Sequence, residues 1–589
     1  MHHALILPFG ATLLPDGQTR FRLWAPSTPT VSLEFDGQAP MPMQAMDGGW
    51  HEVTVSAPLG TRYRYRLPDG LAVPDPASRL QAPDVHDPSV VVDPAAYDWR
   101  NTGWQGKPWH EAVVYEAHAG AMGGFSGIRQ RLPELRRLGI TAVEIMPIAD
   151  FPGGRNWGYD GVLPFAPDTA YGTPDELKAL IDEAHGLGLM VFLDVVYNHF
   201  GPDGAYLHAY AKPFFREDIS TPWGAAIDFR RPEVCDYFIQ NALYWLMEYR
   251  FDGLRFDAVH AISEESFLRD LARTIRATVE PGRHVHLVLE HENNRAALLR
   301  TGLDVPGSGN GGFDAQWADD FHHCLHVLLT GESEGYYEDF QDTTRLLADC
   351  LASGFAYQGQ MSPHLGRPRG EPSGHLPTTA FVVCLQNHDQ IGNRAMGERL
   401  TTLADPQALR SAMALLLLCP FVPMLFMGEE YAARNPFLFF TSHNEDLAKL
   451  VREGRRAEFK HFAAFQDEAR RKAIPDPNAP KTFDASVVDQ ADPAMFTFVQ
   501  DLLALRRQHV IPGIPGCRSL DVDVDVLAPG ALRAEWRLGT GQRLAITLNL
   551  GHETASSASP AGGVIFANPP GTALASMPPG SIVVQVTAE

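Results

Sequence analysis

The chain has 589 residues, a net charge of −23 at pH 7 and a hydrophobic fraction of 45%. This length exceeds one ordinary domain, although an α/β barrel with insertions can take up most of it. Asp and Glu are spread along the sequence rather than gathered in blocks. An acidic surface of this kind repels phosphate backbones, so the composition argues against nucleic-acid binding.

The cysteines and the apolar stretches indicate the setting of the protein. The six cysteines lie far apart and form no Cys-x-x-Cys pair, so neither a structural zinc site nor a disulfide framework is expected. Residues 1–8 lack a basic region, which argues against a signal peptide. The longest apolar stretch, residues 413–427, is broken by Pro420 and Pro423 and is short for a membrane span. We therefore expect a soluble cytoplasmic protein with no membrane partner.

Residues 1–95 show no long helical periodicity. Short alternating runs occur instead, separated by turn formers such as Asp36-Gly37, at residues 19–24, 30–35, 51–56 and 62–67. Short strands at this spacing predict a small β-sandwich. The proline-rich residues 73–94 are expected to form a linker that lies over the next domain.

In residues 96–512 the sequence changes to alternating strand-like and helix-like segments. Eight apolar runs lie at residues 113–117, 142–146, 190–195, 253–256, 285–289, 313–317, 381–385 and 424–427. Amphipathic stretches separate most of them, at residues 174–187, 232–249, 263–278 and 406–418, with a final helix expected at 495–509. The pattern predicts an α/β fold, a (β/α)8 barrel. Residues 198–227 and 321–377 are too long for plain connections and are expected to shape a cleft.

In residues 513–589 the sequence again shows strand-like runs. Apolar runs there occupy residues 519–527, 532–538, 542–550, 564–567 and 581–586. These runs predict a small C-terminal β-domain.

Four barrel segments end in acidic residues. Asp194 closes the third strand, whereas Asp257, Glu290 and Asp389 follow the fourth, fifth and seventh. Strand ends of such a barrel meet at its C-terminal face, so the four carboxyl groups are predicted to share one pocket. Glycosidic bond cleavage usually needs two carboxyl groups, one that donates a proton and one that attacks or stabilises the sugar cation.

The neighbours of these acids predict different roles for them. Arg255 and Asp257 are two residues apart on a strand and face the same way, so the guanidinium is expected to keep Asp257 ionised. The apolar run before Glu290 is expected to raise its pKa, so that it holds a proton at neutral pH. Asp389, next to His388, is placed to hold sugar hydroxyls as positive charge develops.

Other interpretations of these residues remain open. A single Asp at a strand end is more often a turn or cap residue, and His199, His260 and His388 taken one by one are more often packing residues. Glu292 competes with Glu290, which is favoured because it directly ends the apolar run. The pair His322-His323 would suit a metal, but no acidic partner stands at ligand spacing.

Residues 194–199, 253–260, 287–290 and 386–389 resemble the four signature regions of the α-amylase superfamily of glycoside hydrolases and transglycosylases. The resemblance spans the whole barrel. It implies that Asp257 is the nucleophile, Glu290 the general acid/base and Asp389 the transition-state stabiliser, with Asp194 as a structural and electrostatic support. The superfamily retains anomeric configuration, which implies carboxyl groups about 5–5.5 Å apart.

The flanking sequence resembles particular members of that superfamily. Residues 21–26, 50–53 and 63–66 are similar to the immunoglobulin-like N-terminal domain of branching, debranching and trehalose-releasing enzymes. Residues 198–204, 386–394 and 425–431 resemble the maltooligosyltrehalose trehalohydrolase family, and residues 317–323 resemble a substrate-binding stretch of it. Such enzymes cut the α-1,4 bond next to a terminal trehalose unit and release trehalose and a shorter maltooligosaccharide.

The same resemblance implies the ligands. Substrate contact is implied for Trp157, Tyr159, Asp160, His199, Arg255, Phe256, Ala258, Val259, His260, Asp319, Asp320, Phe321, His322, His323, His388, Gln390 and Asn393. The expected partners are maltooligosyl-trehalose and related α-glucans, and a metabolic pairing with a maltooligosyl-trehalose synthase is implied. Asn198 matches a calcium-ligand position of many α-amylases, but further ligands are not found, so no metal and no cofactor are expected.

Three rival functions remain open, and activity distinguishes two of them. Glycogen branching enzyme shares the architecture and the three carboxylates, and it would create branch points on amylose. A silent glucan-binding relative would keep the groove without turnover. A scaffold associated with a transporter would need a membrane segment.

Overall fold

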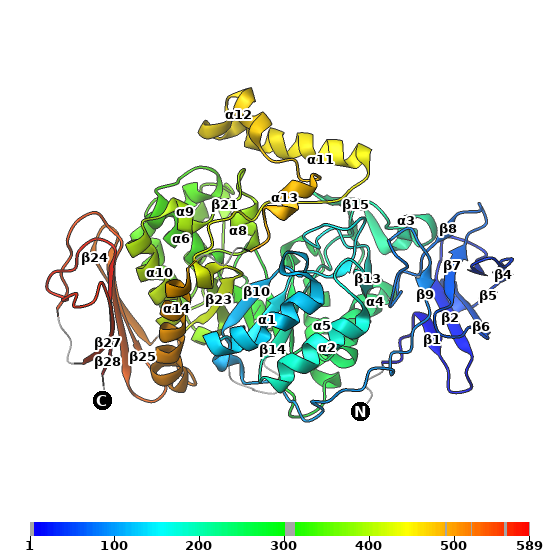
Figure 1. The fold of residues 1–589 in the computed structure, drawn as a ribbon, viewed down its shortest axis with the longest axis horizontal. Helices are drawn as coiled ribbons and strands as arrows, with labels where there is room; N and C mark the ends of the chain where they lie inside the picture. Colours follow the sequence, from blue (N-terminus) through cyan, green and yellow to red (C-terminus); the bar gives the residue numbers. More distant parts are fainter. Residues whose placement is uncertain (1–4, 301–311, 489–491, 520, 559–561, 588–589) are drawn as a thin grey trace.

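The computed structural model describes residues 5–300, 312–488, 492–519, 521–558 and 562–587. A central barrel lies between two β-domains, one at each end of the long axis (Figure 1). Residues 1–4, part of the stretch that argues against a signal peptide, lie outside the described residues. Over the described ranges, the structure contains no helix with the length and apolar character that crossing a membrane requires.

The N-terminal domain consists of two packed antiparallel sheets. One has the order β1 (Gly10–Leu13), β2 (Thr19–Trp24), β6 (Trp50–Val55), β5 (Gln44–Ala45), and the other β4 (Met41–Pro42), β3 (Ser32–Phe35), β7 (Arg62–Arg66), β8 (Ala72–Val73), with β9 (Ser89–Val90) also on β7. Phe21 of the first sheet meets Phe35 and Tyr63 of the second at ring-centroid distances of 5.8 and 4.8 Å. The predicted β-sandwich is confirmed.

Residues 73–94 lie over the barrel domain, as expected, but they are more than a linker. The segment contributes β9 and the last residue of β8 to the second sheet. The buried carboxylate of Asp75 accepts hydrogen bonds from the hydroxyls of Tyr63 and Tyr65 at 2.8 and 3.1 Å. Arg79 also donates to Glu248 of the barrel domain at 3.3 Å. These buried polar contacts make the segment part of the domain and of its junction with the barrel.

Eight parallel strands close into the barrel. They are β10 (Val114–Ala117), β11 (Ala142–Ile145), β14 (Met190–Val195), β17 (Gly253–Phe256), β18 (His286–Leu289), β19 (Ala315–Trp317), β22 (Phe381–Cys384) and β23 (Val422–Phe426). Pairing of β10 with β23 completes the ring. Every strand begins and ends within two residues of its predicted position, so the (β/α)8 barrel is confirmed.

Helices cover the outside of the barrel. The main ones are α1 (Gly124–Leu138), α2 (Pro174–Gly186), α4 (Pro232–Leu243), α5 (Glu265–Thr278), α6 (Asp319–Thr330), α7 (Thr343–Ser353), α10 (Pro406–Leu418) and α14 (Pro493–Leu505). Residues 321–377, expected to shape a cleft, include most of α6 and all of α7, which pack on each other. The role of this segment in shaping a cleft stays a prediction. Residues 198–227 hold the short α3 (Leu207–Tyr210) and the hairpin β15 (Phe215–Thr221)–β16 (Gly224–Ile227).

Smaller elements complete the barrel domain. Two hairpins, β12 (Ala149–Asp150)–β13 (Leu163–Pro167) and β20 (Met361–Ser362)–β21 (Arg367–Pro368), lie in its loops, as do the short helices α8 (His388–Gly392) and α9 (Leu400–Leu403). After β23, α11 (Glu445–Glu458) and α12 (Glu468–Ala473) project from the body above α13 (Pro480–Asp484) (Figure 1). This helical arm was not predicted.

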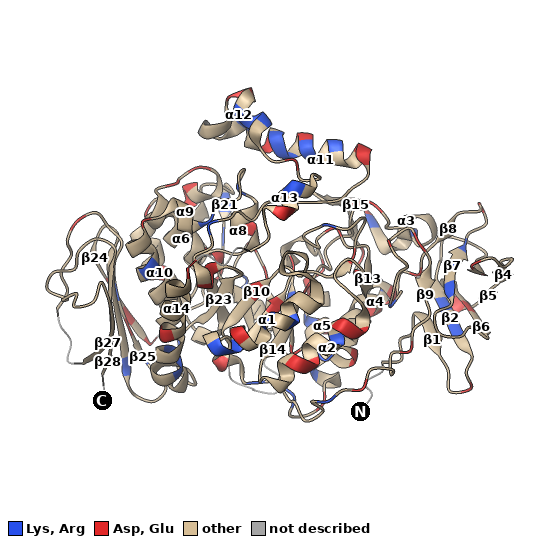
Figure 2. Cartoon of the chain, viewed as in Figure 1, with Lys and Arg blue, Asp and Glu red and all other residues tan. Residues whose placement is uncertain are grey.

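The C-terminal domain is one antiparallel sheet. Its order is β24 (Val522–Ala528), β25 (Ala531–Arg537), β26 (Arg543–Asn549), β28 (Ser581–Thr587), β27 (Gly563–Asn568), which confirms the predicted β-domain. The sheet packs on α7 and α10, where Ser411 donates to the carbonyl of Gly580 at 2.8 Å. Acidic and basic residues occur in all three parts of the molecule (Figure 2).

Arg506 provides a test of how the last helical turn is fixed to the barrel. Its buried guanidinium donates to the carbonyl oxygens of Leu417, Cys419 and Phe421 at 3.1, 2.6 and 2.5 Å, at the end of α10. Arg506→Met should leave these carbonyls unpaired and cost ~2–5 kcal/mol of stability. Thermal unfolding should show a melting temperature lowered by several degrees. The exposed neighbour gives the control, Arg507→Met, and equal melting temperatures for the two variants would contradict the assignment.

Candidate active site

Arg255 occupies the centre of the C-terminal mouth of the barrel. Its Nη1 atom lies 2.6 Å from Oδ2 of Asp194 and 2.9 Å from Oδ1 of Asp257, and its Nη2 atom lies 2.7 Å from Oε2 of Glu290. Strand register explains the first contact, since Asp194 of β14 stands directly opposite Arg255 of β17. Three of the four predicted strand-end carboxylates therefore contact one guanidinium.

The guanidinium is buried and rests on an aromatic ring. Arg255 has no exposed surface, and its Cζ atom lies 4.1 Å from the ring centroid of Trp317 on β19. A cation over an indole face is stabilised by the ring quadrupole, most strongly where water is excluded. Trp317 thus contacts one face of the guanidinium of Arg255, while the carboxylates contact the nitrogen atoms at the edge of that group.

The predicted ionisation of the pair Asp257 and Glu290 needs correction. Burial, opposed by Arg255 and reinforced by the facing Glu290, raises the pKa of Asp257 well above its ordinary value. Burial also acts to raise the pKa of Glu290, but Arg255 and the backbone N–H of Ala258, 2.8 Å from Oε2, together lower it. The expected order is reversed because the guanidinium reaches Glu290 as well, and because Asp257 faces other acids.

Glu290, rather than its competitor Glu292, belongs to this cluster. Glu290 follows β18 directly, and its backbone N–H donates to the carbonyl of Phe256 at 3.0 Å. The side chain of Glu292 is 42% exposed and makes only a long ion pair with Arg367, at 3.8 Å. This geometry favours Glu290 as the candidate acid.

Asp389 lies on α8, next to His388. The side chain of Asn387 accepts hydrogen bonds from the backbone N–H groups of Asp389 and Gln390 and so caps this short helix. Oδ1 of Asp389 lies 3.5 Å from Nε2 of His388 and accepts from Nδ2 of the exposed Asn393 at 3.2 Å. Burial raises the pKa of Asp389, although His388 opposes the shift. Gln390 is half-buried beside it.

Tyr159 provides an aromatic wall, whereas Trp157 is packed inside. The Tyr159 ring stacks on His388 with centroids 5.1 Å apart and planes 20° apart, and its hydroxyl donates to Oδ2 of Asp194 at 2.6 Å. Trp157 is buried, stacks on Phe437 and donates to the carbonyl of Leu438. Contact of Trp157 with a sugar ring stays a prediction.

Asp160 and His199 lie on the far side of Tyr159. Asp160 accepts from Asn156 at 2.6 Å and lies 3.3 Å from Nε2 of His443. His199 pairs through Nε2 with the carbonyl of Tyr159 at 3.0 Å. The half-exposed ring of Trp223, from the β15–β16 hairpin, stacks on His199 with centroids 4.8 Å apart.

Phe256 is the last residue of β17, and Ala258, Val259 and His260 follow the strand. Phe256 and Val259 are buried, and their contact with sugar stays a prediction, while Ala258 contributes its N–H to Glu290. Ala258 adopts a left-handed conformation with φ of 40°, which turns the chain sharply after Asp257. His260 is exposed.

The stretch from Asp319 to His323 forms the first turn of α6. Asp320, Phe321 and His322 are fully or almost fully buried, and their contact with substrate stays a prediction. Asp320 pairs with Arg369 at 2.8 Å and caps backbone N–H groups of residues 356 and 357. Asp319 is half-buried, and burial together with Glu290 and Asp389 raises its pKa to about 7. His323 is half-buried against Tyr336 and Phe340.

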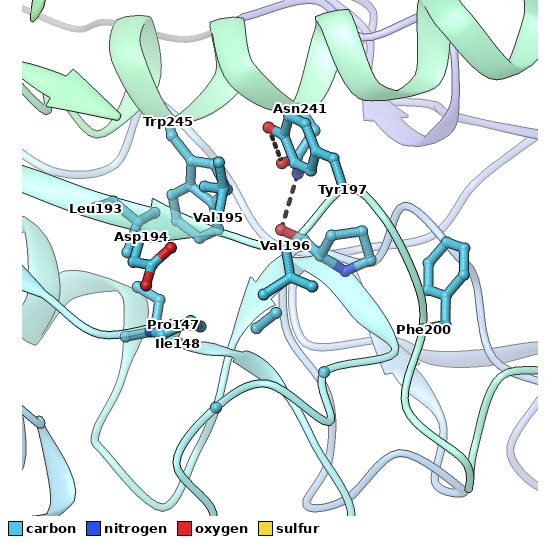
Figure 3. Close-up of a pocket in the computed structure, with 14 residues that line it drawn as sticks. Pro147, Ile148, Leu193, Asp194, Val195, Val196, Tyr197, Phe200, Asn241 and Trp245 are labelled. Atoms are coloured by element: carbon cyan, nitrogen blue, oxygen red, sulfur yellow. Dashed lines mark hydrogen bonds between the residues drawn. The ribbon is translucent and has the colours of Figure 1, made fainter. Parts of the chain in front are cut away.

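A small cavity lies behind β14, not at the mouth. It has a volume of about 20 Å³ and is lined by residues that include Asp194 and Asn241 (Figure 3). Tyr197 donates to Asn241 at 2.7 Å, and Asn241 donates to the carbonyl of Pro164 at 2.8 Å. A cavity of this volume has room for about one water molecule and excludes a sugar. Asn241 joins α4 to β13 and to the residues that follow β14.

Glu116 and Trp223 were not predicted as site residues, and Trp317 was predicted only as the first residue of the stretch 317–323. Glu116 of β10 accepts from Nδ1 of His388 at 2.5 Å, Trp317 carries Arg255, and Trp223 covers His199. The strand-end rule applied to the first barrel strand could have identified Glu116, whereas nothing in the local sequence places Trp223 near His199. Among the described residues, no group of three or more His, Cys, Asp or Glu side chains is arranged to hold a metal ion.

Comparison with known families places the chain. The family model of the alpha amylase catalytic domain matches residues 100–221. The model of carbohydrate-binding module 48 (isoamylase N-terminal domain) matches residues 8–79, and that of a domain of unknown function matches residues 520–584. A malto-oligosyltrehalose trehalohydrolase of Deinococcus radiodurans is 41% identical over 85% of this chain and 83% of its own. The chain belongs to the malto-oligosyltrehalose trehalohydrolase family.

Further members and solved structures agree with this family. The malto-oligosyltrehalose trehalohydrolase of Saccharolobus solfataricus is 37% identical over 88% of this chain and 89% of its own. A crystal structure from Salmonella typhimurium, described as that of an alpha amylase, is 44% identical with a TM-score of 0.94 and covers 99% of this chain and 100% of its own. An Anoxybacillus pullulanase, 18% identical with a TM-score of 0.73 over 100% of this chain and 88% of its own, shares the fold.

Replacing the central arginine tests whether its forked geometry matters beyond its charge. Arg255→Lys keeps one positive charge but cannot reach three carboxylates from two nitrogens. We expect kcat/KM to fall about 10²-fold, equivalent to ~3 kcal/mol. Arg66, whose guanidinium holds Glu34 in the N-terminal domain by two hydrogen bonds, provides the matched control, Arg66→Lys. Equal activity of the two variants would show that charge alone suffices.

Proposed function

We propose that this protein is a retaining glycoside hydrolase that cleaves the α-1,4-glucosidic bond next to the terminal trehalose of maltooligosyl-trehalose. The products are trehalose and a shorter maltooligosaccharide. One observation carries the proposal: a single buried guanidinium contacts both candidate catalytic carboxyl groups at the mouth of a family-typical barrel. Membership of the trehalohydrolase family over most of the chain supports the substrate.

The proposed chemistry divides two roles between Asp257 and Glu290. Asp257 attacks the anomeric carbon while Glu290 protonates the glycosidic oxygen, which gives a covalent glycosyl-enzyme and free trehalose. Glu290 then takes a proton from water as the water attacks, and Asp257 leaves. When a sugar lies between Asp257 and Glu290, positive charge develops at the anomeric carbon and favours the ionised form of Asp257. A proton is then held on Glu290 and not on Asp257.

The remaining residues hold the sugar in this proposal. Asp389 and His388 accept and donate hydrogen bonds to hydroxyls of the ring at the cleavage point, and Tyr159 stacks beside it. The trehalose unit lies near Asp319 and His323, which border the same mouth from α6. Asp194 keeps Arg255 and the Tyr159 hydroxyl in place, through contacts of 2.6 Å each.

The wider setting remains a prediction. A maltooligosyl-trehalose synthase would supply the substrate, and the cytoplasm is the expected compartment. We expect activity in the presence of a chelator, since the mechanism uses no metal ion. A 1,4-alpha-glucan branching enzyme of Corynebacterium jeikeium is 33% identical over 46% of this chain and 41% of its own, and branching activity is the alternative that the following test distinguishes.

Product analysis tests the proposal. The protein is incubated with maltopentaose, with its trehalose-ended counterpart and with amylose. We expect trehalose from the second substrate, little action on maltopentaose and no new branch points on amylose. Branch points without trehalose release would instead establish a branching enzyme, and absence of turnover on all three would establish a silent relative.

Two variants test the roles of the carboxyl groups. Asp257→Asn and Glu290→Gln should each lower kcat for trehalose release about 10³-fold, because one lacks the nucleophile and the other the proton donor. Glu292→Gln is the matched control, two residues from Glu290 and outside the cluster, and should keep most activity. A larger loss in Glu292→Gln than in Glu290→Gln would exchange the two assignments.

The stereochemical course gives an independent check. Proton NMR of the sugar released early in the reaction should show the α-anomer of the new reducing end, since two displacements at one carbon retain configuration. Initial release of the β-anomer would contradict a covalent intermediate on Asp257.

A further inference from the structure

Glu116 is a buried acid that the mechanism above leaves without a role. It lies on β10, the first barrel strand, with 1% of its surface exposed. Its two carboxylate oxygens both contact the same residue: Oε1 lies 2.5 Å from Nδ1 of His388, and Oε2 accepts from the backbone N–H of His388 at 3.2 Å. The contact joins the first barrel strand to the helix that carries Asp389, across 272 residues of sequence.

This contact fixes the orientation of the imidazole. With Nδ1 bound to Glu116, Nε2 is the nitrogen left to face Asp389, at 3.5 Å. The ring faces are held by stacking against Tyr159, with Trp157 edge-on at 5.6 Å and Trp317 tilted at 6.1 Å. The second ring nitrogen, Nε2, therefore faces Asp389, the group proposed to hold the sugar.

We propose that Glu116 is a positioning residue that orients His388 and holds its ring as an imidazolium, so that Nε2 always presents an N–H to the bound sugar. This inference rests on the proposed function, which places the sugar beside His388 and Asp389. A neutral imidazole could offer Nε2 as an acceptor instead, because the proton could stay on Nδ1. A carboxylate on Nδ1 together with a second one near Nε2 favours a proton on both nitrogens.

The charges around the ring agree with this assignment. Groups that interact with His388 come from every surrounding element: Glu116, Glu144, Asp194, Glu290, Asp389, Arg255 and His118. Burial acts to lower the pKa of His388, but Asp389 and Glu116 raise it to about 9. The folded pKa lies above the ordinary value, so the ring is charged at neutral pH and loses its proton only as pH rises toward 9.

The site then contains two buried cations, Arg255 and His388, which contact different acids. Arg255 cannot lose its charge and contacts Asp194, Asp257 and Glu290. His388 contacts the other two acids, Glu116 and Asp389. Without the charge on Glu116, Asp389 would remain as the acid in contact with the imidazolium, and the pKa of His388 would fall toward its ordinary value.

NMR of the full-length protein measures the protonation state directly. The chain is labelled with 13Cε1-histidine, and the His388 signal is assigned by its loss in His388→Gln. In the wild type we expect a ring that is protonated at pH 7 and titrates near pH 9. In Glu116→Gln the pKa should fall by at least about 2 units, to or below the ordinary histidine value.

A matched control distinguishes the effect of the Glu116 charge from the effect of replacing any buried acid of the barrel. Glu144 stands directly opposite Glu116 in the pairing of β10 with β11, and burial raises its pKa well above the ordinary value, which favours its neutral form. No hydrogen bond joins Glu144 to His388 among the described residues, so Glu144→Gln should change the His388 titration much less than Glu116→Gln does. A shift as large as that in Glu116→Gln would overturn the assignment.

The pH dependence of trehalose release gives the functional readout. In Glu116→Gln, kcat/KM should fall at least about tenfold between pH 6 and pH 8, since a histidine of ordinary pKa is mostly neutral at pH 8. The wild type should show no such fall over this range. A structural defect alone would lower activity at all pH values alike.

Each outcome decides the proposal. A wild-type His388 pKa below 7, or an unchanged pKa in Glu116→Gln, overturns it. The wild-type titration decides alone if Glu116→Gln does not fold by circular dichroism. If the titrations agree but the wild type releases no trehalose, the proposed function fails while the role of Glu116 in charging His388 stands.

Discussion

The contact of one guanidinium with three carboxylates determines how this site is built. Arg255 has no exposed surface, lies on the ring of Trp317 and contacts Asp194, Asp257 and Glu290 within 2.9 Å. Carboxylates at such close range repel one another strongly unless a cation lies between them. The guanidinium therefore allows acids from three adjacent strands to occupy one pocket, and it also fixes their positions.

The fold supplies the elements that make this contact. Parallel register sets Asp194 opposite Arg255, and the sharp turn at Ala258 directs a backbone N–H at Glu290. His388 repeats the arrangement with Glu116 and Asp389 on the opposite side of the mouth. Both cations are flanked by aromatic rings, Trp317 beneath one and Tyr159 against the other, and these rings exclude water where the charges meet.

The barrel and the acids at its strand ends could be predicted from the sequence because both follow local rules. Buried parallel strands are continuous apolar runs, and polar residues at their ends must face one rim. Local rules do not determine which side chains are buried or which residues far apart in the sequence come into contact. Trp157 and Phe321 carry residue types that suit sugar binding, yet they are packed inside. The ionisation of Asp257 and Glu290 was predicted from sequence neighbours, whereas it depends on groups brought together by strands far apart in the chain.

Trapping of the covalent intermediate tests most directly the claim that Asp257 and Glu290 divide the chemistry. Glu290→Gln is mixed with α-maltosyl fluoride, whose leaving group needs no proton, and the digested protein is examined by mass spectrometry. Our account predicts a maltosyl group on the peptide that contains Asp257, and none in the double variant that also carries Asp257→Asn. A maltosyl group on another carboxylate, or fluoride release without any adduct, would contradict it.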